Sequence, residues 1–123
     1  MMAAAKPEID PDRARELLRR ERERVDGELA EVERARRSAI DEADTATAAE
    51  DDADVIEEGA RDDARERQLR AELEAIGRAE KRLADGTYGL SIESGEPIPA
   101  KRLEAVPWAE RTAAEQKRRE RSS

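Results

Sequence analysis

Apolar residues recur at seven-residue intervals over the first third of the chain. The repeat is formed by Leu18, Val25, Val32 and Ala39, with Leu29 and Ala43 on the adjoining heptad position and Leu17 and Ile40 beside the stripe. Asp10 and Pro11 precede it, and an acidic cap followed by proline is typical of a helix start. No further proline and a single glycine follow before about Ala46. The pattern predicts a helix from about residue 11 to about residue 46, with a seam suited to one partner helix.

A second apolar repeat, at spacings of four and three residues, predicts another helix from about residue 53 to about residue 84. It is formed by Leu69, Leu73, Ile76 and Leu83, with Glu80 at the intermediate position. Gly86 can adopt the left-handed conformation that ends a helix. The join between the helices, TATAAEDDAD, is short and polar. We therefore expect an antiparallel coiled-coil hairpin, an arm about 50 Å long with its tip at the join.

The residues after Gly86 predict a small module of different character. Residues 88–98 alternate loosely between apolar and polar and contain Gly89, Gly95 and Pro97, which favours a small hairpin or knuckle. A last helix is expected to open at Pro107 or Trp108 and to run to about Arg121. Candidates for a small core here are Tyr88, Ile92, Ile98, Leu103, Val106 and Trp108. The fold class is thus mainly α-helical, with a flexible N-terminus at 1–10, the hairpin at 11–85 and the knuckle with the C-terminal helix at 86–123.

Composition narrows the function classes. The chain has 123 residues, of which 46% are charged and 2% aromatic, so little apolar surface is available for a compact core with a deep pocket. Cysteine and histidine are both absent, which removes the thiolate and imidazole groups that most often serve as nucleophile, general base and zinc ligand. We therefore expect a protein that is not an enzyme. No apolar run approaches the roughly 20 residues needed to cross a bilayer, and MMAAAKPEID lacks the apolar centre of a signal peptide, so a cytoplasmic location is expected.

Charge is distributed unevenly along the chain. The net charge is −8, and residues 38–60 contain nine acidic residues and no basic one, so the remaining residues sum to about +1. A polyanion would be repelled by this acidic stretch, which argues against sequence-specific nucleic-acid binding there. A short basic cluster, Lys117 to Arg121, lies at the other end and is most simply a solvated helix end.

Several segments resemble the DksA/TraR-type zinc-finger proteins, bacterial regulators that bind RNA polymerase. The resemblance runs through RAEKRL at 78–83, GTYG at 86–89, Ser91-x-x-Ser94-Gly95 and RLEA at 102–105. In the family's pattern the positions of Ser91, Ser94, Thr112 and Glu115 are the four cysteines that hold one zinc. Three hydroxyl groups and one carboxylate make a poor zinc set, so we expect a knuckle without zinc or any other cofactor. The less favoured alternative is a weak hard-cation site at Glu115 with Glu93 or Glu96.

The resemblance also implies a partner and a mode of action. In the family the coiled-coil arm enters the secondary channel of RNA polymerase and presents acidic tip residues in a pattern like Asp-x-x-Asp-x-Ala. Counting back from the knuckle places Asp51 and Ala53 on the second half of that pattern, while the first acidic position falls on Ala48. Asp52 and Asp54 are neighbours that could substitute, which puts the acidic tip near residues 47–54. Dependence on a nucleotide alarmone stays open.

Two alternatives accompany this interpretation. An acidic stretch between two helices can be a solvated turn without a function of its own. The chain could also be a structural or adaptor coiled-coil protein that has kept the family outline and lost polymerase regulation, since its cysteine positions are replaced and its tip pattern is half matched.

Overall fold

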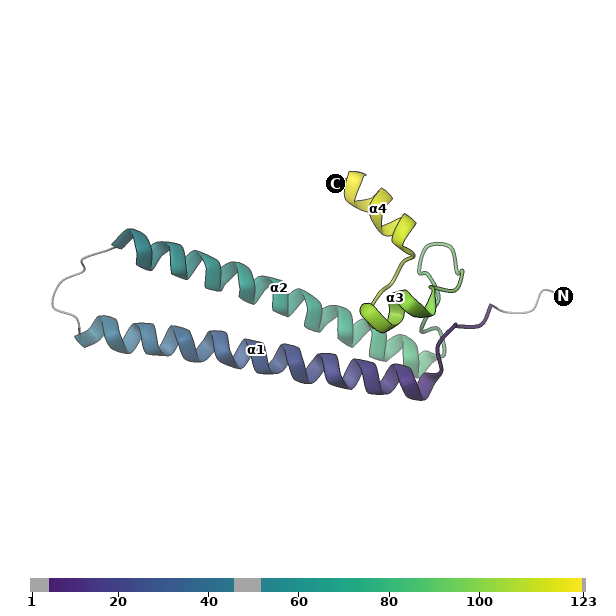
Figure 1. Cartoon of the computed structure of the whole chain (residues 1–123), viewed down its shortest axis with the longest axis horizontal. Coiled ribbons are helices and arrows are strands. Elements are labelled where there is room, and N and C mark those ends of the chain that lie inside the picture. Colours follow the sequence, from purple (N-terminus) through teal and green to yellow (C-terminus); the bar gives the residue numbers. More distant parts are fainter. Residues whose placement is uncertain (1–4, 46–51, 123) are drawn as a thin grey trace. The chain divides into compact units, whose positions relative to one another are not determined.

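The chain folds into helices, as the heptad patterns predict. The computed structural model describes residues 5–45 and 52–122, and the side chains of residues 5–42 and 56–122. Within these residues the chain forms α1 (Pro11–Thr45), α2 (Asp52–Asp85), α3 (Ala100–Ala105) and α4 (Ala113–Ser122), shown in Figure 1. The fold class predicted from the sequence, two long antiparallel helices followed by a small knuckle and a C-terminal helix, is confirmed. The chain divides into two compact units, residues 23–73 and residues 1–22 with 74–123.

Helix α1 begins where the Asp10-Pro11 pair predicts. The Asp10 side chain accepts a hydrogen bond from the backbone N–H of Asp12 at 3.1 Å, and its carbonyl accepts from the N–H of Ala14 at 2.9 Å. The first of these bonds uses an N–H group of the first turn that has no backbone partner within the helix, and the second is the first i to i−4 bond of α1.

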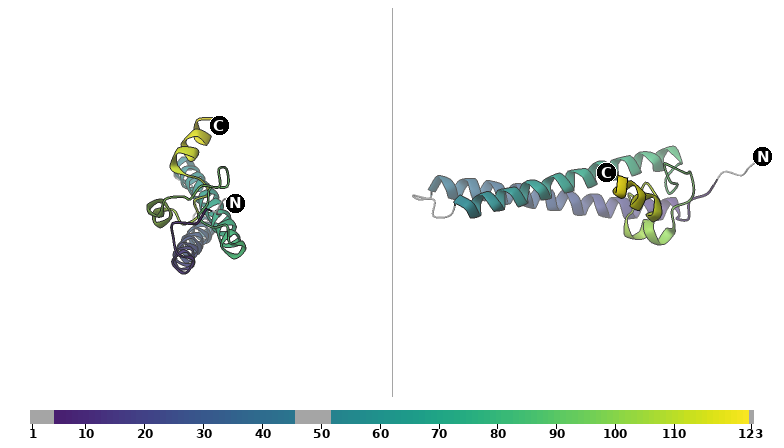
Figure 2. Two further views of the ribbon diagram at one scale, coloured as in Figure 1. Left: turned by 90° about the vertical axis from the view of Figure 1, so that its right-hand side faces the viewer. Right: turned by 90° about the horizontal axis from the view of Figure 1, so that it is seen from above.

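In the unit of residues 23–73, α1 and α2 run side by side in opposite directions (Figures 1 and 2). Their ion pairs follow this order, because Arg24 pairs with Glu72 while Arg36, further along α1, pairs with Glu66 and with Asp63. The apolar seam is shorter than the heptads predict. Among the described side chains of this unit, the buried apolar ones are Val25, Leu29 and Leu69, whereas Val32 and Leu73 are half-buried and Ala39 is exposed.

Near Ile40 and Ile56, ion pairs replace apolar contacts between α1 and α2. Ile40 and Ile56 are 61% and 69% exposed, and the described contacts between the helices near them are ion pairs of arginine with acidic residues. Arg36 is central, since its guanidinium bonds two α2 carboxylates. Partly exposed pairs of this kind contribute little individually, so Val25, Leu29 and Leu69 supply most of the hydrophobic stabilisation here.

The other unit holds the larger core. The start of α1, the end of α2 and the segments after Gly86 share it, with Leu18, Ile76, Ile98 and Leu103 all buried. Tyr88 is buried as well and donates its hydroxyl to the carbonyl of Pro107 at 2.8 Å. Burial raises the pKa of this hydroxyl to about 12. Tyr88, Ile98 and Leu103 are therefore core residues, as predicted.

The remaining core candidates lie elsewhere than expected. Ile92 is 49% exposed, and Val106 and Trp108 are half-buried. Ile92 lies in a turn, and its backbone N–H bonds the carbonyl of Glu110. The alternation of apolar and polar residues around Ile92 therefore does not correspond to a strand. Leu90 and Pro97 form an isolated antiparallel bridge, and no strand is assigned within the described residues.

The C-terminal helix begins later than predicted. It opens at Ala113 and not at Pro107 or Trp108, and the short helix α3 precedes it. The reason is that the N–H of Ala109 bonds the carbonyl of Val106, and the carbonyl of Glu110 bonds Ile92. This segment therefore follows the knuckle as a turn before the chain becomes helical.

The first residues of the chain pack against the knuckle. A Cβ atom on Gly89, whose φ is +83°, would lie 2.8 Å from the Cβ of Pro7, so only glycine fits at this contact. Ile9 is buried, and the Glu8 carboxylate accepts a bond from the N–H of Ala100 at 3.1 Å. Arg13 forms two parallel bonds with Glu104, at 3.0 and 2.8 Å. Residues 7–13 thus connect the knuckle and α3 to the base of α1.

None of the helices in the described part of the chain is long and apolar enough to cross a membrane.

Candidate functional site

The four positions predicted as former zinc ligands come together in the knuckle. Ser91 follows the Leu90 bridge and opens a turn, and Thr112 and Glu115 lie at the start of α4. The Ser91 hydroxyl donates to Oε1 of Glu115 at 2.7 Å, and the same oxygen accepts from the N–H of Thr112 at 2.8 Å. A single carboxylate oxygen therefore joins the turn to the helix.

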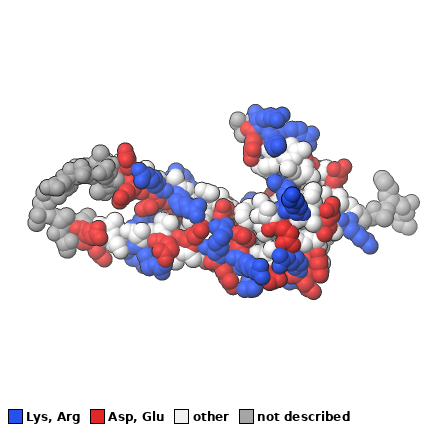
Figure 3. Space-filling model, in the orientation of Figure 1, with Lys and Arg blue, Asp and Glu red and all other residues white. Residues whose placement is uncertain are grey.

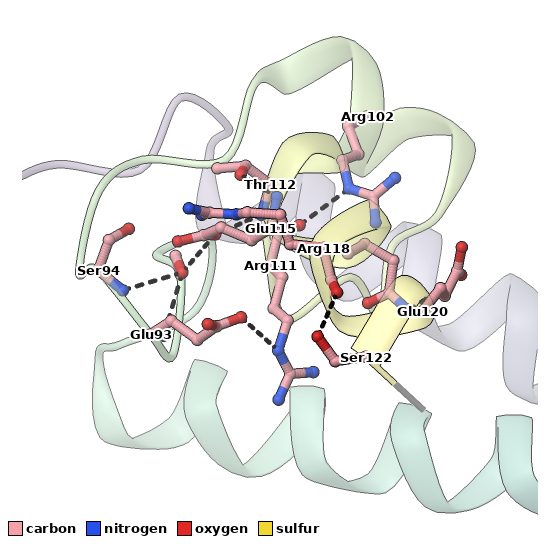
Figure 4. Close-up of polar contacts among 11 residues, drawn as sticks. Glu93, Ser94, Arg102, Arg111, Thr112, Glu115, Arg118, Glu120 and Ser122 are labelled. Carbon is pink, nitrogen blue, oxygen red and sulfur yellow. Dashed lines mark hydrogen bonds and ion pairs between the residues drawn. The ribbon is translucent and has the colours of Figure 1, made fainter.

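Thr112 and Glu115 also cap α4 reciprocally. The N–H of Glu115 bonds the Thr112 hydroxyl at 3.3 Å while the Glu115 carboxylate bonds the N–H of Thr112, which is the capping-box arrangement (Figure 4). The Thr-x-x-Glu sequence was thus a visible signal for a helix start at residue 113.

The Ser91 hydroxyl oxygen also accepts hydrogen bonds from the backbone of the turn that follows it. It accepts the backbone N–H groups of Glu93 at 3.1 Å and Ser94 at 3.2 Å. Ser94, which is exposed, accepts the N–H of Glu96 on its own hydroxyl at 3.3 Å. We name Ser91, Ser94, Thr112 and Glu115 the hydroxyl-carboxylate cluster.

The centre of this cluster is buried. Ser91 is 4% and Glu115 6% exposed. The N–H of Thr112 first, and the Ser91 hydroxyl second, stabilise the ionised carboxylate and lower the pKa of Glu115 to about 2. Glu115 is therefore charged near neutral pH, and the bonds that its carboxylate makes among the described residues come from N–H and O–H donors.

Arginine side chains near the cluster form hydrogen bonds and ion pairs that link the segments of the knuckle to one another and to α2. Arg111 donates to Glu93 at 2.8 Å, and Arg102 donates to the carbonyl of Arg111 at 2.9 Å. Figure 4 shows both bonds beside the start of α4. Arg78 of α2 pairs with Glu110 at 2.8 Å. Sequence reasoning did not find these pairs, because charged residues are so frequent in this chain that no spacing distinguishes them.

The residues of the cluster do not suit a zinc ion. Zinc prefers thiolate and imidazole ligands, and the one carboxylate present already accepts the hydrogen bonds of Ser91 and Thr112. Among the described residues there is no group of three or more acidic, cysteine or histidine side chains that could hold a metal. In the alternative cation site, Glu93 is engaged by Arg111. A cation site at Glu115 with Glu96 stays a prediction.

The predicted acidic tip lies partly outside the described residues. Asp51 is not described, whereas Asp52, Ala53 and Asp54 lie in the first turn of α2 with their side chains undescribed. Whether these residues form a binding tip stays a prediction.

Basic side chains gather on α4. After Glu115, the only buried residue of this helix, Lys117, Arg118, Arg119 and Arg121 are all exposed. Figure 3 shows them as a basic surface over α4.

Comparison with known proteins places this arrangement in a family. The pattern described as "Prokaryotic dksA/traR C4-type zinc finger" matches residues 86–121. The RNA polymerase-binding transcription factor DksA of Caulobacter vibrioides is 40% identical over 106 residues, which cover 86% of this chain and 67% of that protein. The chain belongs to the DksA/TraR family.

Two further similarities agree with membership of the DksA/TraR family. General stress protein 16O of Bacillus subtilis is 48% identical over 44 residues, 36% of this chain and 27% of that protein. The transcription factor DksA2 from Pseudomonas aeruginosa has a similar structure, with a TM-score of 0.73, 26% identity and coverage of 91% of this chain and 84% of that one. The chain thus spans about a quarter of the first relative and about two thirds of the DksA protein.

The family's zinc finger is of the four-cysteine type, whereas this chain contains no cysteine. Among Ser91, Ser94, Thr112 and Glu115, which the sequence resemblance predicts to be the former ligand positions, the structure has a carboxylate that binds two donors. Hydrogen bonds from Ser91 and Thr112 to Glu115 therefore link the two segments of the knuckle.

Proposed function

We propose that this protein binds RNA polymerase, inserts the end of its helical arm into the secondary channel and modulates transcription initiation. It acts without chemistry of its own, in the cytoplasm, and without reading a DNA sequence. The arm is residues 11–85, and the knuckle with α4 is residues 86–123.

The observation that carries the proposal is the similarity to DksA over 106 residues, which make up 86% of this chain. That relative is named as RNA polymerase-binding, and the structural neighbour is named as a transcription factor. The charge distribution agrees, because the nine acidic residues of 38–60 surround the join of the two helices.

We assign the effect on transcription to the carboxylates of Asp51, Asp52 and Asp54, with Ala53 between them. A carboxylate at the end of a narrow arm can enter a basic cavity that contains magnesium and alter the charge around the metal. The knuckle and α4 supply docking area. The tip is therefore needed for the effect on initiation and not for folding or for binding.

The test combines a binding assay with the lifetime of open promoter complexes. Wild type, Asp51→Asn and an Asp51/Asp52/Asp54 triple Asn variant are compared at a promoter whose open complex is short-lived. Asparagine removes charge and nearly preserves shape. Asp26→Asn, an exposed residue of α1, is the matched control. We expect all four proteins to bind polymerase, and the triple variant alone to lose most of the effect on lifetime, with Asp51→Asn intermediate.

Other results would change the assignment. If the triple variant alters the lifetime as wild type does, the acidic stretch is a solvated turn. If wild type does not bind polymerase, the structural or adaptor function replaces the regulatory one.

A further inference from the structure

The exposed basic side chains of α4 take no part in the contacts that hold the knuckle. They are Lys117, Arg118, Arg119 and Arg121 (Figure 3). None of these four side chains forms a hydrogen bond or an ion pair with another residue in the part of the chain that the structure describes. Lys117 and Arg121 are four residues apart, and Arg118 and Arg121 are three apart, so these three cations share one face of the helix. We name the four residues the α4 basic surface.

The α4 basic surface differs from the long helices, where arginines are balanced by carboxylates. The arginines of α1 that pair with acidic residues include Arg13, Arg15, Arg20, Arg24 and Arg36. On α4 the acidic residues are Glu115, which is buried and bonded within the hydroxyl-carboxylate cluster, and Glu120, which accepts from Gln116. The dipole of the helix adds only about half a negative charge at its end, which offsets a small part of four positive charges.

The excess negative charge of the chain belongs to the other unit. In residues 23–73, acidic residues outnumber Lys and Arg by 18 to 8, whereas in residues 1–22 with 74–123 Lys and Arg outnumber acidic residues by 16 to 14. The net charge of −8 therefore does not describe the surroundings of α4 within its own unit. A local positive surface of this kind attracts a polyanion.

The chemistry of the α4 basic surface selects among the classes of partner. The centres of protein interfaces are rich in aromatic and aliphatic residues, and helices that lie on membranes carry an apolar face. The only apolar residues of α4 are two alanines, and its buried residue is Glu115. Single-stranded nucleic acids are bound by stacking their bases on aromatic side chains, which α4 does not contain. The phosphates of a duplex are bound by Lys and Arg alone, which is what this surface offers.

We propose that the α4 basic surface binds the phosphate backbone of double-stranded DNA without regard to sequence. Lys117, Arg118 and Arg121 contact phosphates, and Arg119 adds to the positive charge beside them. DNA is favoured over duplex RNA, because proteins bind duplex RNA largely through its 2′-hydroxyl groups and shape, which a group of cations does not read. The proposal goes beyond polymerase binding and does not rest on it.

The expected binding is weak and depends steeply on salt. Three or four phosphate contacts give a plot of log K against log salt concentration with a slope of about −3, because each neutralised phosphate releases nearly one counterion. The affinity should therefore fall roughly 50-fold between about 50 mM and about 200 mM salt. The measurement is the fluorescence anisotropy of a short labelled DNA duplex, titrated with the full chain in the absence of polymerase. A second duplex of unrelated sequence should bind equally well.

Substitutions on α4 test whether this surface makes the contact. Lys117→Gln with Arg118→Gln and Arg121→Gln removes three charges, and glutamine is a good helix former, so α4 stays helical. We expect this variant to bind the duplex at least about tenfold more weakly, with a slope much closer to zero. Arg118→Lys with Arg121→Lys keeps the charge and should bind within about twofold of wild type, because phosphate contacts depend mainly on charge. Circular dichroism checks that both variants keep their helices.

A variant of the same unit serves as the matched control. Lys6→Gln with Lys81→Gln and Lys101→Gln also removes three charges from exposed residues, none of which is on α4. It should keep the affinity of wild type to within about twofold, because charges away from the contact are screened by salt.

Several results would overturn the proposal. Wild type that does not bind the duplex at low salt shows that the α4 basic surface is only a solvated helix end. Equal weakening in the α4 variant and in the lysine control shows attraction by overall charge with no defined surface. Tighter binding to single-stranded DNA or to duplex RNA of the same length assigns the surface to another ligand. Because polymerase is absent, none of these outcomes bears on polymerase binding.

Discussion

Glu115 shows how one residue can link two segments of the knuckle through hydrogen bonds alone. Its carboxylate accepts from Ser91 in the turn and from Thr112 at the helix start, and only 6% of the residue is exposed. A buried carboxylate with two directional donors fixes the two segments relative to each other. The cost is that the arrangement depends on a single charged group.

Replacing that group should loosen the knuckle locally. In Glu115→Gln the neutral amide is a weaker acceptor for the Thr112 N–H, and its NH₂ group introduces donors where only an acceptor is needed. We expect the amides of Glu93, Ser94 and Thr112 to exchange with solvent at least about tenfold faster, measured by hydrogen exchange. Glu120→Gln, on the same helix and exposed, is the control. Equal protection in both variants would show that Glu115 does not hold the knuckle.

The ionisation of Glu115 also predicts a dependence on pH. Its pKa in the folded protein is about 2, below the ordinary value of 4.5 that applies when the chain is unfolded. A lowered folded pKa contributes stability above the unfolded value, and this contribution is lost as pH falls from about 4.5 towards 2. The melting temperature of wild type should therefore fall across this window. Glu115→Gln should show a shallower fall there, and identical slopes would contradict the assignment.

At the scale of the elements, the long helices were predictable and the C-terminal segment was less so. A seven-residue repeat over three turns or more leaves few alternatives to a helix, and α1 and α2 begin and end within about a residue of their predicted bounds. Residues 100–115 carry no such repeat. There, the spacing of Thr112 and Glu115 fits both a pair of metal-ligand positions and a capping box. The family resemblance favours the ligand positions, so the capping box was not predicted.

The extent of the seam was overestimated because a heptad pattern does not show which positions are covered. Val25 is fully buried and Ile40, fifteen residues later on the same helix, is mostly exposed. Val25→Asp places a charge in the seam and should destabilise the helices by about 3–5 kcal/mol. Ile40→Asp should change the free energy of unfolding by less than about 0.5 kcal/mol. Urea unfolding followed by circular dichroism measures both, and equal effects would mean that no shared seam exists.

At the scale of the whole molecule, the sequence predicted the order of the parts but not how the N-terminal residues contribute. The contacts of Pro7 with Gly89 and of Glu8 with Ala100 join segments more than eighty residues apart. Pro7 and Glu8 belong to no periodic pattern of apolar residues, so the sequence does not predict which segments they contact. The ion pair of Arg13 with Glu104 is similar, because many other acidic residues could have been its partner.

The absence of cysteine and histidine makes a prediction for the whole fold. A structural zinc normally supplies much of the free energy of folding of a small domain, and a chelator then unfolds it. Here the knuckle is closed by Glu115 and by the buried residues Tyr88, Ile98 and Leu103. We expect the melting temperature of wild type to be unchanged by a chelator or by added zinc.

A variant with Ser91, Ser94, Thr112 and Glu115 all replaced by cysteine should bind about one equivalent of zinc and lose stability on chelation, if these positions correspond to the family's ligands. Zinc bound stoichiometrically to wild type, and lost together with its helical structure, would show that the hydrogen-bonded cluster does not hold the knuckle by itself.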